Sequence, residues 1–205
     1  MTAGGPSPRE ERGRAAAGCR RGRRVIGEQR IERLIGEREI RDRVAQMGRA
    51  ITEDFEGRPI HAIGVLKGSF MFLSDLVRRI ELDVSVDFLG LSSYGSQEKT
   101  TGVVRMTQDL TAPIEDRHVL IVEDIIDTGL TMSYLLENLG TRRPESLSVC
   151  TLLHKPVNTR TDIDIDYVGF EIPDEFVIGY GLDYVEYYRN VPYIGVLRDE
   201  DDPTE

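Results

Sequence analysis

The sequence predicts an α/β fold, in which helices flank a central and mostly parallel sheet. Strand-like segments alternate with segments of helical periodicity through the middle of the chain. Residues 119–122 form an unbroken apolar run, which is the pattern of a parallel strand covered on both faces. A chain of 205 residues, 40% of them hydrophobic, suits one compact domain with a sizeable core.

In the first half of the chain the predicted strands and helices alternate. Residues 33–35 predict a short strand, and residues 37–55 predict an amphipathic helix with a charged outer face. The inner face of that helix carries Ile40, Val44, Met47 and Ile51. Residues 59–66 predict the first central strand, and residues 70–80 predict the helix that follows it.

In the second half, residues 82–91 and 102–107 predict the two strands of a hairpin with a polar, glycine-containing tip. After the apolar run at 119–122, leucines at helical spacing predict a helix that begins near Thr131 and stops at Gly140. Three further strands are predicted at residues 147–153, 167–172 and 193–197.

The charge pattern separates both ends of the chain from its body. Residues 1–24 carry seven Arg and two Glu, so the rest of a chain of net charge −10 carries −15. We expect a disordered Arg-rich tail at 1–24, a single domain at 25–198 and an acidic tail at 199–205. An acidic body does not favour binding to nucleic acid.

The sequence also indicates where the protein resides. Its apolar runs fall short of the roughly 20 residues that span a bilayer, so we expect no membrane association. Cys150 lies in an apolar strand and predicts a buried, inert thiol, which is typical of a reducing compartment such as the cytoplasm. His61 and His118 stand beside strand starts and are interpreted as structural.

Polar residues follow three of the apolar runs at the points where strands are predicted to end. The three pairs are Lys67-Gly68, Glu123-Asp124 and His154-Lys155. Ligands of open α/β sheets bind beyond the carboxyl ends of the strands, so we expect these pairs to converge on one cleft.

The segment Asp127-Thr-Gly-Leu-Thr131 is predicted to open a helix. The first amides of a helix are unsatisfied and lie at the positive end of its dipole, so they suit a phosphate. Gly129 allows close approach of the main chain, and the hydroxyls of Thr128 and Thr131 add donors. The neighbouring acids would repel phosphate and therefore favour sugar hydroxyls, Mg²⁺ or a proton on a base. Together these groups predict a phosphorylated ribose as ligand.

The longer segment Glu123-Asp-Ile-Ile-Asp-Thr-Gly-Leu-Thr131 resembles the phosphoribosyl-diphosphate-binding motif of purine phosphoribosyltransferases, the bacterial hypoxanthine-guanine type in particular. The resemblance covers about residues 33–197. It implies a type I phosphoribosyltransferase fold, with a small hood subdomain made from the N-terminal strand and residues near 160–190. The sequence departs from some relatives at Ser69, and at Leu130 where they carry lysine.

The resemblance also implies roles for individual residues, with Asp127 as the general base. Phosphoribosyl diphosphate would be bound by Glu123, Asp124, Asp127, Thr128, Gly129, Leu130 and Thr131. Its pyrophosphate would be bound by Lys67, Gly68 and Arg189, with a cis peptide between Leu66 and Lys67. The purine would be bound by Lys155, Phe176, Val177 and Asp183, and Mg²⁺ by Glu123, Asp124 and Asp183. Ser93 and Tyr94 would belong to a mobile loop over the site.

Taken alone, several of these residues have simpler interpretations. Lys67 also suits a capping turn, Lys155 suits an exposed surface, and Phe176 suits core packing. A lysine has hydrogen-bond donors only, so Lys155 beside a base would favour a 6-oxopurine over adenine.

The function that the resemblance implies is Mg²⁺-dependent transfer of the 5-phosphoribosyl group from phosphoribosyl diphosphate to hypoxanthine or guanine. The products would be IMP or GMP and pyrophosphate, which would make the protein a pentosyltransferase of purine salvage. Family members are commonly homodimers or homotetramers. Two alternatives stay open: a xanthine-preferring phosphoribosyltransferase, and a regulatory, nucleotide-sensing protein of the same fold that binds nucleic acid.

Overall fold

The main sheet has six strands in the order β4-β3-β2-β5-β6-β7. The computed structural model describes residues 29–93 and 104–199. The strands are β2 (Ile60–Leu66), β3 (Val84–Ser93), β4 (Val104–Gln108), β5 (His118–Ile126), β6 (Ser146–His154) and β7 (Tyr167–Glu171). Neighbouring strands are parallel except β3 and β4, which are antiparallel. The predicted α/β class and mostly parallel sheet are therefore confirmed.

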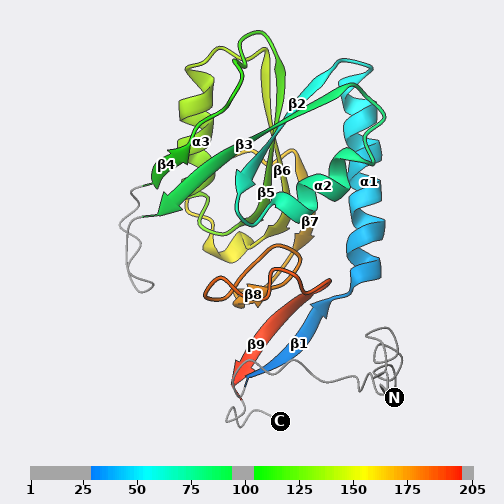
Figure 1. The fold of residues 1–205 in the computed structure, drawn as a ribbon, viewed down its shortest axis with the longest axis vertical. Coiled ribbons are helices and arrows are strands. Elements are labelled where there is room, and N and C mark those ends of the chain that lie inside the picture. Colours follow the sequence, from blue (N-terminus) through cyan, green and yellow to red (C-terminus); the bar gives the residue numbers. More distant parts are fainter. Residues whose placement is uncertain (1–28, 94–103, 200–205) are drawn as a thin grey trace, which may run out of the picture.

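Helices cover both faces of this sheet (Figure 1). Helices α1 (Glu37–Phe55) and α2 (Phe70–Val77) pack on one face, and α3 (Leu130–Gly140) packs on the other. The four predicted apolar residues of α1 are all buried in the first of the two core clusters. Cys150 is fully buried in the same cluster, as predicted, and its burial raises the pKa of the thiol. No helix in the described ranges is long and apolar enough to cross a membrane.

Several predicted boundaries were wrong, including the start of the first strand, which lies at Gln29 and not at residue 33. Strand β5 does not stop at Val122 but continues to Ile126, because its main chain still pairs with β6, with Glu123 opposite Thr151. Main-chain pairing does not depend on side-chain polarity, so acidic residues can occupy the end of a strand. Helix α2 ends at Val77 and not at residue 80, although Ile80 is still buried in the turn that follows.

A second, smaller sheet contains three strands in the order β1-β9-β8. They are β1 (Gln29–Ile35), β9 (Ile194–Asp199) and β8 (Val177–Ile178), and both pairings are antiparallel. Figure 1 shows this sheet beyond the carboxyl ends of the main strands. The last strand of the chain thus joins the first one and does not extend the main sheet. Strand β7, which lies in the range assigned to the hood, pairs with β6 in the main sheet.

The predicted tails fall largely outside this description. The Arg-rich segment 1–24, with Cys19, lies outside the described residues. Of the acidic segment 199–205, Asp199 is the last residue of β9, and residues 200–205 lie outside the described range.

Candidate active site

The predicted phosphate loop lies between β5 and α3. Gly129 is the N-cap of α3, with a φ of 79°, and its carbonyl accepts the amide of Ser133 at 2.9 Å. A Cβ added to Gly129 would overlap the Thr161 hydroxyl, so this position requires glycine for space as well as for backbone conformation. The loop therefore presents the first amides of an 11-residue helix, as the sequence predicted.

A segment that the sequence did not single out supports this loop from behind. It consists of Thr159, Arg160 and Thr161, which come directly after the short 3₁₀ turn Pro156–Asn158. The carbonyl of Thr128 accepts the amide of Arg160 at 3.0 Å and the hydroxyl of Thr161 at 3.5 Å. The Thr159 hydroxyl donates to the carbonyl of Asp127 at 3.4 Å. The sequence signal for this segment was a run of polar residues after the end of β6. That run matches no functional motif, so it was not singled out.

Glu123 and Asp124 lie at the carboxyl end of β5, beside the Lys67-Gly68 turn. A Cβ on Gly68 would overlap the carboxylate of Asp124, so the two predicted strand ends do converge. Burial, reinforced by the charge of Asp124, raises the pKa of Glu123 well above its ordinary value. Burial raises the pKa of Asp124 to about 6, opposed by main-chain amides and by the charge of Arg189. One oxygen of Glu123 is buried without a hydrogen-bond partner in the described structure.

Lys155 and Asp127 meet at the centre of the site. The Lys155 side chain is only 9% exposed, so its interpretation as an exposed surface lysine was wrong. Its Nζ lies 3.9 Å from Asp127 Oδ2 and 3.2 Å from Asp174 Oδ1, and its amide donates to the Ile126 carbonyl at 2.9 Å. Asp127 Oδ1 is buried and lacks a hydrogen-bond partner in the described part of the chain. The Asp127 side chain as a whole is 46% exposed, so its other oxygen, Oδ2, is open to a ligand and suited to accept a proton from it.

The cations predicted to bind pyrophosphate lie close to two acids. Lys67 Nζ is 2.8 Å from Glu186 Oε2, and Arg189 Nη2 is 2.6 Å from Asp183 Oδ1. The peptide between Leu66 and Lys67 is cis, as predicted. A Cβ on Gly181 would overlap the Gly68 carbonyl, so the loop that carries Arg189 packs directly on the Lys67-Gly68 turn. The sequence did not single out Glu186.

Phe176 is 56% exposed, so the core-packing interpretation was wrong. Its ring packs edge-to-face against Tyr184, with 5.8 Å between the centroids. Val177, the next residue, is buried in β8 and fixes the backbone beside it. An exposed ring on a fixed backbone is available to stack against a flat base.

The predicted mobile-loop residues are not placed. Ser93 is the last residue of β3, its side chain is not described, and Tyr94 lies outside the described residues.

The two histidines interpreted as structural, His61 and His118, lie away from this site, as expected. His61 is buried, with Nδ1 2.9 Å from the Ser85 hydroxyl, and His118 Nδ1 lies 2.8 Å from the Ser146 hydroxyl.

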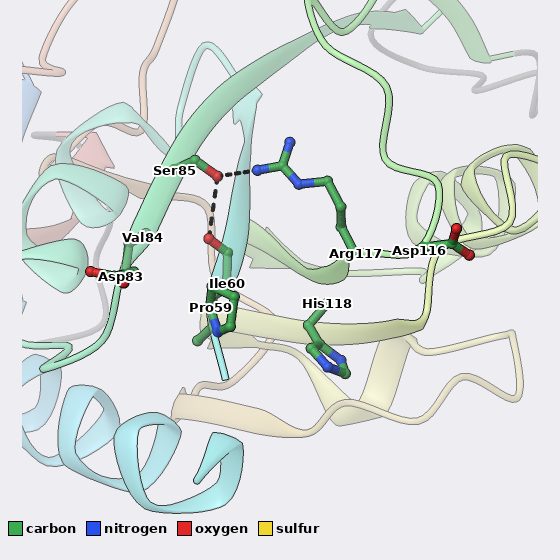
Figure 2. Close-up of a pocket in the computed structure, with 8 residues that line it drawn as sticks. All are labelled: Pro59, Ile60, Asp83, Val84, Ser85, Asp116, Arg117 and His118. Atoms are coloured by element: carbon green, nitrogen blue, oxygen red, sulfur yellow. Dashed lines mark hydrogen bonds between the residues drawn. The ribbon is translucent and has the colours of Figure 1, made fainter. Parts of the chain in front are cut away.

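A cavity of about 400 Å³ lies at the opposite edge of the sheet, where β2, β3 and β5 begin (Figure 2). The Arg117 side chain crosses it and donates to the Ser85 hydroxyl at 2.5 Å. A second cavity, of about 410 Å³, lies among α1, α2 and residues 180–192. Neither is lined by a residue predicted for the site.

The carboxylates fit a divalent cation in chemical type, since Mg²⁺ prefers hard oxygen ligands. Charges of both Asp183 and Arg189 act on Asp124, which shows that these groups share one environment. No three Asp, Glu, His or Cys side chains form a ready-made metal cluster within residues 29–93 and 104–199. A cation bound here would therefore need oxygen ligands from the substrate as well.

Comparison with known proteins gives a consistent result. Residues 35–185 match the model of the phosphoribosyl transferase domain. A hypoxanthine-guanine phosphoribosyltransferase of Staphylococcus epidermidis is 50% identical over 161 residues, which are 78% of this chain and 90% of that protein.

Solved structures agree with the sequence match. The crystal structure of a Bacillus anthracis hypoxanthine-guanine phosphoribosyltransferase has a TM-score of 0.77 and 46% identity, covering 80% of this chain and 97% of that one. A Staphylococcus aureus hypoxanthine phosphoribosyltransferase has a TM-score of 0.78 and 47% identity, covering 82% and 91%.

Proposed function

The chain belongs to the phosphoribosyltransferase family, and on that basis we propose that it transfers the 5-phosphoribosyl group from phosphoribosyl diphosphate to N9 of hypoxanthine or guanine. The products are IMP or GMP and pyrophosphate, so the reaction belongs to purine salvage. The observation that carries this proposal is the pairing of Asp127 and Lys155 beside the amides that open α3.

In this proposal the amides and hydroxyls of Thr128, Gly129 and Thr131 hold the 5-phosphate of the substrate. Leu130 contributes its main chain only, and the helix dipole favours the anion. Glu123 and Asp124 face the ribose hydroxyls. Burial raises the pKa of both carboxyls, and nearby cationic charge would favour their ionised form once substrate binds.

The base is held by groups of complementary chemistry. Lys155 donates a hydrogen bond to the 6-oxo group, and the Phe176 ring stacks on the purine plane. The exposed oxygen of Asp127, Oδ2, accepts the proton from N7 as N9 attacks the anomeric carbon. The Val177 main chain lies at the edge of the base.

Loss of pyrophosphate leaves positive charge on the sugar, and the leaving group is stabilised by Lys67, the Gly68 amide and Arg189. Glu123, Asp124 and Asp183 would hold Mg²⁺, which would supply positive charge to neutralise the diphosphate. We further propose a cytoplasmic protein that forms a homodimer or homotetramer and binds neither membrane nor nucleic acid.

The test is an assay of pyrophosphate formation from phosphoribosyl diphosphate with hypoxanthine, guanine or xanthine, each with and without Mg²⁺. We expect turnover with hypoxanthine and guanine, dependent on Mg²⁺. A strong preference for xanthine would replace the proposed substrates, and absence of turnover with all three bases would refute the enzymatic proposal.

A further inference from the structure

Glu186 occupies a place that the proposed reaction does not explain. Its carboxylate lies 2.8 Å from Lys67 Nζ and 3.9 Å from Arg189 Nη2, the two side-chain cations assigned to pyrophosphate. The Lys67 ammonium donates a hydrogen bond to this carboxylate. An acid thus stands where an anionic product is expected to bind.

The backbone holds Glu186 in this position. Val185 and Glu186 both have positive φ, at 50° and 68°, a conformation that is costly for a β-branched residue. The amide of Glu186 donates to Asp183 Oδ2 at 2.8 Å, and Tyr184 and Tyr187 exchange main-chain hydrogen bonds across the turn. Lys67 and Glu186 are 119 residues apart in sequence, so this turn brings together two distant parts of the chain.

The charges in this group balance before any ligand arrives. Asp183 pairs with Arg189, and Glu186 pairs with Lys67 and lies near Arg189, so two acids neutralise two bases. Pyrophosphate carries several negative charges and needs both cations. It must therefore displace the Glu186 carboxylate from Lys67 or bind against its repulsion.

We propose that Glu186 is an internal competitor of pyrophosphate, which pairs with Lys67 and Arg189 in the free enzyme and weakens their hold on the leaving group. This inference rests on the proposed function. Both members of the Lys67–Glu186 pair are about two-thirds exposed, so the pair itself is weak and an anionic ligand can open it. Weaker binding of pyrophosphate favours its release after transfer.

The test is calorimetric titration of inorganic pyrophosphate into the full-length protein and its Glu186→Gln variant, at one fixed Mg²⁺ concentration. We expect the variant to bind pyrophosphate about three- to tenfold more tightly, because an ion pair and a repulsion are removed together. Product inhibition by pyrophosphate should tighten by a similar factor. The difference should narrow as salt is raised, since exposed charges are screened.

The matched control is Glu115→Gln. Glu115 forms an exposed ion pair with Arg143, so the variant has the same change in net charge at a position remote from Lys67. It should bind pyrophosphate as the unaltered protein does. If Glu186→Gln bound pyrophosphate equally well or more weakly, Glu186 would be neutral or would orient Lys67, and the inference would be wrong. If the unaltered protein neither bound nor formed pyrophosphate, the proposed function itself would fail.

Discussion

At the scale of single residues, Asp127 has the most specific surroundings in the proposed site. One of its carboxylate oxygens is buried without a partner, and the other lies 3.9 Å from the Lys155 ammonium. Leaving a buried acceptor unpaired costs about 1–3 kcal/mol, so such atoms are uncommon unless a ligand completes them. The exposed oxygen beside Lys155 is the one whose geometry agrees with a proton acceptor for the base.

Replacing Asp127 with Asn should therefore lower turnover by roughly 10²- to 10⁴-fold, the usual contribution of a general base. The affinity for phosphoribosyl diphosphate should change little, because the amides of the phosphate loop remain. Steady-state rates and a direct binding measurement check the two parts separately. Undiminished turnover would remove Asp127 from the role of base.

Asp124 makes a prediction about pH. Its pKa in the folded protein is about 6, above the ordinary value of 3.8, so between these values the folded state holds a proton that the unfolded state releases. The folded state therefore loses stability as pH rises from about 4 to 6. The full effect of a two-unit shift is about 3 kcal/mol.

The side chain at position 124 cannot ionise in the Asp124→Asn variant, so the variant escapes this loss of stability. The free energy of unfolding of the variant minus that of the unaltered protein should therefore grow between pH 4 and pH 7 and then level off. Urea unfolding of the ligand-free proteins at several pH values measures this. The control is Asp162→Asn, which makes the same change in net charge at an exposed position. An advantage that stayed constant with pH would contradict the raised pKa.

At the scale of the elements, sequence patterns located most of the fold. Helix α1 was predicted with its observed bounds, because an apolar stripe on a charged helix defines both the face and the length. The acidic end of β5 was taken for a loop, because polarity was used as a strand boundary where main-chain pairing with β6 decides it. The support of the phosphate loop by Thr159 and Thr161 was missed, since it depends on tertiary contacts alone.

The phosphate loop gives a prediction at this scale. Gly129→Ala should destabilise the fold by about 1–3 kcal/mol and weaken binding of phosphoribosyl diphosphate, because it adds strain at positive φ and overlaps Thr161. Chemical unfolding and the KM for phosphoribosyl diphosphate measure the two effects.

Gly140→Ala is the matched control, because nothing lies within 4 Å of its added Cβ and it belongs to the same helix. It should be neutral or slightly stabilising, by up to about 1 kcal/mol. The double variant Gly129→Ala/Thr161→Ala should recover only the part of the lost stability that comes from overlap with the Thr161 hydroxyl. A Gly129→Ala protein with unchanged stability and KM would contradict the tight loop described above.

At the scale of the whole molecule, the site is assembled from segments that are distant in sequence. Residues near 67, 124, 155 and 186 meet because parallel strands bring their carboxyl ends to one edge, and the loop before β9 closes over that edge. The sequence predicted the convergence of three strand ends. It could not predict that Glu186 would reach Lys67, since a turn with strained backbone places it there.

The most direct test of the central claim is a crystal structure with GMP bound. We predict the phosphate against the amides of residues 128–131, the ribose beside Glu123 and Asp124, and the base between Lys155 and Phe176. A nucleotide bound instead in the cavity beside Arg117, with the amides at the start of α3 free of phosphate, would contradict the account.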